Sequence, residues 1–201
     1  MLDGLNKSID IQLNVFEKIS SNNKKLMMIL DILEEYALEN NNFKNWYVGA
    51  GGVNQTIFNY YHGYDADYGI KDYDIVYFDS DTSYEAEDII IKDLENRLKD
   101  INVVSDIKNQ ARVHIWYNPK YGANREPYKN VEDAISSWST TVTCIGVRKE
   151  NGKLIVCCPY GLDDLFSMTI RPVKRYMDKK SYDERCKRWK SKWNKLNIIE
   201  W

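Results

Sequence analysis

The spacing of apolar residues predicts two helices at the start of the chain. Residues 5–20 and 24–40 place apolar side chains every three or four positions, which is the repeat of one helix face. The polar sequence SSNN at 20–23 separates the two segments. Residues 1–42 are therefore predicted to form a helical hairpin that packs on the rest of the protein.

After residue 42 the pattern changes to short apolar strands that alternate with helices. Strands are predicted at 46–48, 72–78, 102–107, 112–117, 140–148 and 153–158, and helices at 53–61, 83–101 and 182–196. The pair Asn151-Gly152 between the last two strands is typical of a hairpin turn. This order predicts one domain over 1–201 of the α+β (mixed α/β) class, with a core at 43–172 and a C-terminal helical segment at 173–201.

The composition is that of one globular domain. The chain has 201 residues, of which 43% are hydrophobic and 29% charged, so it can bury a core and disorder is excluded. No apolar run approaches the roughly 20 residues that cross a membrane, and no secretory signal begins the chain. The four cysteines show no CxxC or Cys/His spacing. We therefore expect a cytoplasmic protein with no membrane partner.

Charge is distributed unevenly along the chain. Residues 1–100 contain 9 Lys and Arg against 19 Asp and Glu, whereas residues 101–201 contain 19 against 11. Such an asymmetry suits a site that holds a metal on one side and phosphates on the other. It is equally consistent with charges that balance across one domain.

A glycine-rich turn and an acidic pair form the sharpest candidate site. The sequence GAGG at 49–52 lies between a predicted strand and a predicted helix, where the backbone can approach a ligand closely and free N–H groups favour phosphate oxygens. Asp72 and Asp74 begin the strand that follows. Side chains at i and i+2 of a strand share a face, so both carboxylates can converge on a divalent cation. Magnesium is expected, because it accepts one or two carboxylates together with substrate phosphates.

This order of motifs resembles the hG[GS]…DxD signature of the polymerase-beta-like nucleotidyltransferase superfamily. The segments that are similar to a bacterial nucleotidyltransferase-like family span residues 46–172 and read GAGGVNQTIFNYYHG, KDYDIVYFD, KNQARVHIWY, TTVTCIGVR and YGLDDLFSMTIRP. The resemblance implies the superfamily's core sheet with flanking helices. It also implies that a nucleoside monophosphate is transferred from an NTP to an unidentified acceptor, which is a small molecule, a protein or RNA.

The resemblance further implies roles for individual residues. Gly51 and Gly52 cradle the triphosphate, and Asn54 in the following helix also binds the nucleotide. Asp72 and Asp74 hold Mg²⁺, with two ions possible. In the two-metal scheme one ion activates the acceptor hydroxyl and the other stabilises the departing pyrophosphate.

The third catalytic position departs from the superfamily pattern, which usually supplies a carboxylate from a later strand. The matching residue is His114 if that strand is 112–117, or Asp106 if it is 102–107. We predict His114, because residues 112–117 form the better two-sided strand and a neutral imidazole can accept a proton from a hydroxyl. Arg112 on the same predicted strand is assigned to the nucleotide, although it either meets a phosphate or pairs with an acid.

Two functions from different classes follow. The first is a magnesium-dependent nucleotidyltransferase, and the alternative is a catalytically silent nucleotide-binding or regulatory module on the same fold. A glycosyltransferase with a DxD motif is disfavoured, because the glycine turn precedes the acidic pair. Aromatic and basic residues alternate in the helix at 182–196, but an apolar stripe with a solvated basic face explains them, so nucleic-acid binding is not predicted.

Overall fold

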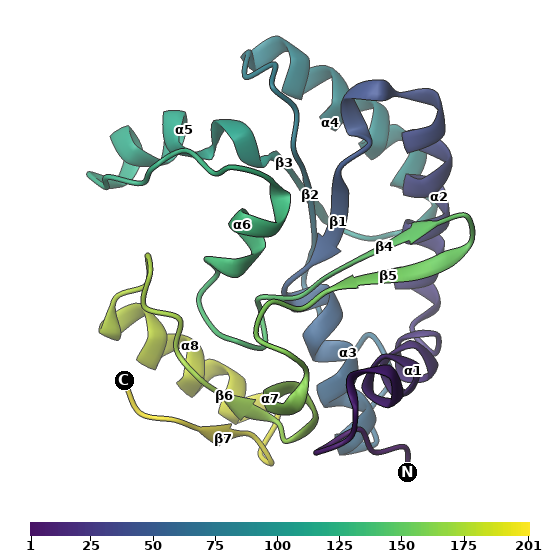
Figure 1. Ribbon diagram of the computed structural model, residues 1–201, viewed down its shortest axis with the longest axis vertical. Helices are drawn as coiled ribbons and strands as arrows, with labels where there is room; N and C mark the ends of the chain where they lie inside the picture. The colour runs from purple at the N-terminus through teal and green to yellow at the C-terminus, as the bar shows by residue number, and fades with distance from the viewer.

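The computed structural model describes all 201 residues and is built around a five-stranded mixed sheet (Figure 1). The strands are β1 (Trp46–Gly49), β2 (Tyr73–Tyr77), β3 (Ser105–Asn109), β4 (Gly146–Glu150) and β5 (Lys153–Cys157), in the spatial order β3-β2-β1-β4-β5. The pair β2 and β3 is parallel, and the other neighbours are antiparallel. Two further strands, β6 (Thr169–Ile170) and β7 (Asn197–Ile198), form a separate parallel pair.

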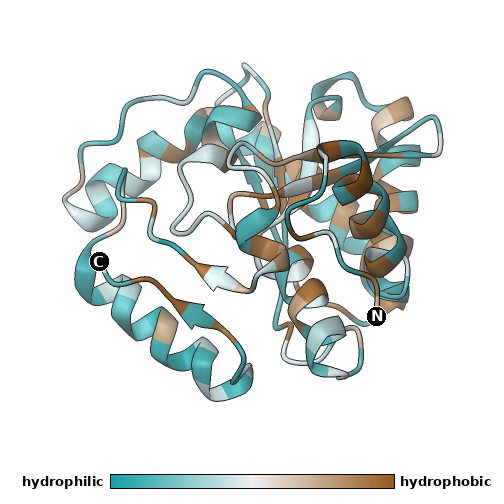
Figure 2. Ribbon diagram, turned by 60° about the horizontal axis from the view of Figure 1, so that its bottom comes forward, coloured by the Kyte–Doolittle hydropathy of each residue, from teal (hydrophilic) through white to brown (hydrophobic).

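Eight α-helices surround the sheet. They are α1 (Ile9–Ser20), α2 (Lys24–Glu39), α3 (Gly51–His62), α4 (Tyr84–Leu98), α5 (Val113–Tyr121), α6 (Val131–Ser136), α7 (Asp163–Phe166) and α8 (Lys179–Lys192). Helices α2 and α4 cover one face of the sheet, and α6 lies against the other (Figure 1). Helix α8, which is mostly hydrophilic, lies beside the β6/β7 pair near the C-terminus (Figure 2). No helix has the length and apolar character needed to cross a membrane.

Alternation along β2 decides which side chains face the site. Ile75 belongs to the main core of 35 buried residues, which extends from the N-terminal helices through α3 and α4 to α7 and α8. Val76 packs on the opposite face, against Val131 and Ile135 of α6. Because successive side chains of a strand alternate, Asp74 lies on the same face as Val76. The main core therefore lies on one face of the sheet, and Asp74 lies on the other face, which it shares with the smaller apolar cluster under α6.

Several predicted elements are confirmed. The two N-terminal helices, the strand-turn-helix around GAGG, the strand at 72–78 and the hairpin at Asn151-Gly152 are all present. Strand β4 begins only at Gly146, because the preceding residues form a turn in which Thr143 N–H donates to the carbonyl oxygen of Thr140 at 3.0 Å.

The predicted strand at 112–117 is wrong. The chain instead forms a 3-10 turn over Gln110–Arg112 and then α5, which ends at Gly122 in the left-handed conformation (φ 59°). A short run rich in apolar residues can form a strand or a segment of buried helix, and periodicity alone does not decide between them. Here Val113 packs in a small cluster with Ala134 of α6, and this tertiary contact favours the helix.

Candidate active site

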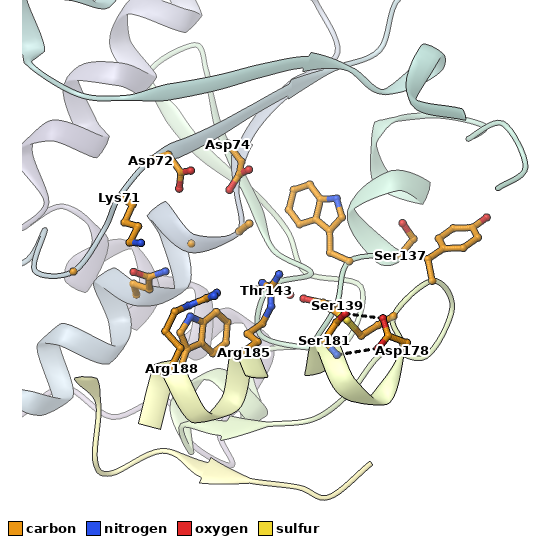
Figure 3. A pocket seen from close by; sticks show the side chains of 18 of the residues that line it. Lys71, Asp72, Asp74, Ser137, Ser139, Thr143, Asp178, Ser181, Arg185 and Arg188 are labelled. Carbon is orange, nitrogen blue, oxygen red and sulfur yellow. Dashed lines mark hydrogen bonds between the residues drawn. The ribbon is translucent and has the colours of Figure 1, made fainter. Parts of the chain in front are cut away.

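Asp72 and Asp74 lie on one face of β2 at the point where this strand begins. Asp74 is paired with Gly49 of β1 in the register of the sheet, and Asp72 precedes it by two residues, about 6.5 Å away between Cα atoms. Figure 3 shows both carboxylates directed into the same cavity. The predicted convergence of the two side chains is therefore present in the structure.

The surroundings of Asp74 disfavour the ionised form of its carboxyl group. Burial, followed by the negative charges of Asp72 and Asp106, raises the pKa of Asp74 to about 7. Arg185 and a hydrogen bond from the Gly51 backbone act in the opposite direction but do not cancel this rise. A cation placed between the carboxylates would relieve this repulsion and favour the ionised form of Asp74.

Asp106 is the third acidic side chain beside this pair. It lies in β3 directly opposite Asp74 in parallel register, and its carboxylate accepts a hydrogen bond from Lys108 Nζ at 2.7 Å. His114 lies in α5, beyond the other end of β3, which is about 13 Å long, and it does not line the cavity. The prediction that His114 rather than Asp106 faces the Asp pair is therefore wrong, because residues 112–117 do not continue the sheet.

The two glycines at the start of α3 have different environments. Gly51 lines the cavity, where an added Cβ would meet only the flexible end of Gln55. Gly52 is buried, and a Cβ there would lie 2.5 Å from a ring carbon of Tyr73. Gly52 therefore allows α3 to pack against β2, and of the two glycines only Gly51 lines the cavity.

We expect Gly52→Ala to lower the free energy of unfolding by about 1 to 3 kcal/mol, because the added methyl group overpacks a rigid aromatic neighbour. The matched variant Gly51→Ala should change this free energy by less than about 0.5 kcal/mol. Urea unfolding monitored by circular dichroism measures both. Equal losses in the two variants would contradict the assignment of Gly52 to packing.

The cavity in front of the Asp pair has a volume of about 600 Å³ and draws its walls from both halves of the chain. Lys71, Asp72 and Asp74 come from the segment that enters β2, and Ser139 and Thr143 come from the turn before β4 (Figure 3). Helix α8 forms a further part of the wall. This helix contributes Ser181, Arg185, Arg188, Trp189 and Lys192.

Arg185 and Arg188 of α8 lie across the cavity from the Asp pair (Figure 3). Sequence reasoning missed them, since it treated the basic residues of this helix as a solvated face. Arg185 is half-buried, and its burial together with the charge of Arg188 lowers its pKa, against the opposing effect of Asp74. The excess of basic residues in the second half of the chain was the signal available for this wall of the site.

Aromatic side chains form another part of the wall. Trp138 lies over the end of β1, where a Cβ on Gly49 would come within 2.5 Å of the indole. Arg125 is held between two tyrosine rings, 3.7 Å from the centroid of Tyr117 and 4.4 Å from that of Tyr176. The flat indole of Trp138 suits a planar ligand group.

Two residues predicted to bind the nucleotide lie outside the cavity lining. Asn54 is fully buried in α3, and neither atom of its amide group has a hydrogen-bond partner. Arg112 forms a buried ion pair with Glu87, and its Nε donates to the carbonyl oxygen of Thr82 at 3.2 Å. Arg112 therefore pairs with an acid, which was the second of the two predicted alternatives.

The acidic residues fit a magnesium ion that is shared with a substrate. No group of three or more His, Cys, Asp or Glu side chains is close enough to hold a metal on its own. Two converging carboxylates, Asp72 and Asp74, nevertheless match the way Mg²⁺ binds through one or two carboxylates, water and substrate phosphates.

Comparisons with known proteins are consistent with this geometry. A family model described as nucleotidyltransferase matches residues 36–198. A solved structure, determined by NMR and described as revealing a CCA-adding enzyme head domain, aligns over 98% of this chain and 100% of its own, with a TM-score of 0.71 and 23% sequence identity. At that identity the likeness shows the fold alone, and it confirms the predicted fold class. No curated protein matches the chain.

Proposed function

This chain belongs to the nucleotidyltransferase family. On that basis we propose that the protein transfers a nucleoside monophosphate from an NTP to an acceptor hydroxyl, and that the transfer takes place in this cavity. The observation that supports this proposal best is the carboxylate pair Asp72 and Asp74, which faces basic side chains across one cavity. In the reaction the acceptor oxygen bonds to the α-phosphorus. The bond from that phosphorus to the bridging oxygen breaks, and pyrophosphate leaves with the electron pair.

Each acidic residue has a distinct part in this proposal. Asp72 and Asp74 would hold Mg²⁺, which when bound neutralises charge on the phosphates and favours ionisation of the acceptor hydroxyl. Asp106 lies opposite Asp74 in β3 and is the nearest further carboxylate that can take the proton of the acceptor. Gly51 directs its backbone toward Asp74 and lets a phosphate approach the start of α3.

A catalytically silent nucleotide-binding module is the second candidate, and one observation favours it. Asp106 is paired with Lys108 and does not line the cavity. If this ion pair persists with a nucleotide bound, no free carboxylate accepts the proton, and the protein would bind an NTP without turnover.

Transfer can be tested with the four NTPs, each labelled at the α-phosphate, in the presence of Mg²⁺ and of pooled small-molecule, protein and RNA acceptors. We expect label on one acceptor class and an equal amount of released pyrophosphate. NTP binding without pyrophosphate release would establish the silent module. Failure to bind any NTP would refute both functions.

The third acidic residue is tested in the same assay. Asp106→Asn should lower the rate of transfer at least tenfold. A general base typically contributes about 10²- to 10⁴-fold to the rate. His114→Ala is the control and should leave the rate within about twofold, because this side chain lies away from the cavity. A loss of activity in His114→Ala with none in Asp106→Asn would show that His114, and not Asp106, acts in the reaction.

A further inference from the structure

Two arginines of α8 differ from every other arginine in the chain. Of the eight arginines, five form ion pairs with an Asp or Glu, and Arg125 donates a hydrogen bond to Tyr128. Arg185 and Arg188 have neither kind of partner: neither guanidinium lies within 4.0 Å of a carboxylate. Two adjacent guanidinium groups without a counter-charge indicate a place for an anion.

We propose that Arg185 and Arg188 bind the β- and γ-phosphates of the NTP, on the wall of the cavity opposite Asp72 and Asp74. This inference rests on the proposed function, since it assigns the part of the substrate that becomes pyrophosphate. Guanidinium groups suit this task because their planar N–H donors match two phosphate oxygens at once.

The charge of the cavity supports a polyphosphate ligand. Its lining contains five basic residues, namely Lys71, Arg125, Arg185, Arg188 and Lys192, against three acids, namely Asp72, Asp74 and Asp178. Asp178 is occupied at the N-terminus of α8, where it accepts hydrogen bonds from Ser181. The basic excess therefore lies mainly along α8 and the acidic pair lies on β2, so an α-phosphate can approach the Asp pair while the outer phosphates extend toward the arginines.

Packing of α8 fixes the backbone that carries both arginines, and it also holds the side chain of Arg185. Trp189 on its apolar face and Trp193 directly after its last residue are buried against Phe58 of α3, with ring centroids 6.1 and 5.9 Å from the phenylalanine. The guanidinium of Arg185 lies 5.6 Å from the centroid of the Trp189 ring, within cation–π distance. A preorganised donor such as Arg185 loses less entropy on binding than a free side chain.

Inorganic tripolyphosphate in EDTA isolates this contact from the metal and from the nucleoside. Calorimetric titration should show binding to the wild-type protein, with affinity at least tenfold weaker in Arg185→Gln and in Arg188→Gln. Lys187→Gln is the matched control, because it removes one positive charge from an exposed position of the same helix and should change the affinity less than twofold. Thermal unfolding of each variant verifies that α8 remains packed.

The outcomes separate this inference from the proposed function. An equal loss of affinity in Lys187→Gln and Arg185→Gln would mean general attraction to a basic surface and would overturn the inference. If transfer occurs but Arg185→Gln changes neither tripolyphosphate affinity nor the KM for the NTP, the inference fails while the function stands. If arginine-dependent binding occurs but no acceptor is ever labelled, the function fails while the phosphate site stands.

Discussion

Asp74→Asn should lower the rate of nucleotidyl transfer by roughly 10²- to 10³-fold, the usual cost of removing one electrostatic contact to a reacting centre. Asp72→Asn should behave similarly, because both carboxylates face the cavity. The change deletes a ligand charge without removing core volume, so the fold should persist. Transfer measured with Mg²⁺ and labelled NTP checks the rate, and Asp100→Asn, at an exposed site outside the cavity lining, is the control.

The same substitution should make the metal-free protein more stable above neutral pH. The folded-state pKa of Asp74 is about 7, against an ordinary value of 3.8, so between these values the folded state keeps a proton that the unfolded state has lost. Stability from this group is complete below about pH 4 and is lost as the pH rises through 7. At pH 8 the ionised, repelled carboxylate costs up to about 4 kcal/mol, and asparagine removes that cost.

This explanation is tested by measuring the unfolding midpoints of the wild type and of Asp74→Asn in EDTA, at pH 5 and at pH 8. Asp74→Asn should raise the midpoint strongly at pH 8 and by less than half as much at pH 5, where the unfolded aspartate is already ionised and the folded one still keeps its proton. Unchanged transfer in both aspartate variants would instead show that the pair is structural. A pH-independent change in the midpoint would show that the repulsion around Asp74 is not the cause.

The second large effect concerns the buried ion pair between Glu87 and Arg112. Glu87 is only 5% exposed, and its carboxylate also accepts a hydrogen bond from the Asn109 backbone N–H at 2.8 Å. We expect Glu87→Gln to lower the free energy of unfolding by about 3 to 5 kcal/mol, because it leaves the Arg112 guanidinium buried without a counter-charge. The midpoint and slope of urea unfolding measure this loss.

A surface pair on the same helix provides the control. Lys92 and Asp88 form an exposed ion pair one helical turn apart in α4, so Lys92→Gln should cost less than about 0.5 kcal/mol. A loss in Glu87→Gln no larger than this would mean that Arg112 is solvated and free to meet a ligand. The original assignment of Arg112 to the nucleotide would then regain support.

The first half of the candidate site was predictable because its residues are close along the chain. The turn at 49–52 and the acids at 72 and 74 belong to one strand-helix-strand unit. The side-chain parity of a strand alone places Asp72 and Asp74 on one face. Glycines between a strand and a helix likewise indicate a tight turn from the sequence alone, because glycine adopts backbone conformations that other residues avoid.

The second half of the site depends on contacts that local patterns do not contain. Asp106 meets Asp74 only through the register of β3 on β2, and residues 112–117 became a helix through packing on α6. The apolar stripe of α8 predicted which face of the helix is buried. The stripe does not indicate what the basic face of α8 lies against. Arg185 and Arg188 were therefore predicted to be solvated.

The sheet order also determines when the site can exist during synthesis. Strand β1 pairs with β2 and with β4. Because β4 lies about 100 residues after β1 in the chain, this pairing is non-local, and non-local contacts slow folding. Asp74 and Arg188 are separated by 114 positions, which a ribosome adds in roughly 6 to 23 s. During that interval the nascent chain contains the two carboxylates but not the arginines that face them. An NTP can therefore stabilise only the completely folded protein and cannot assist folding of the nascent chain.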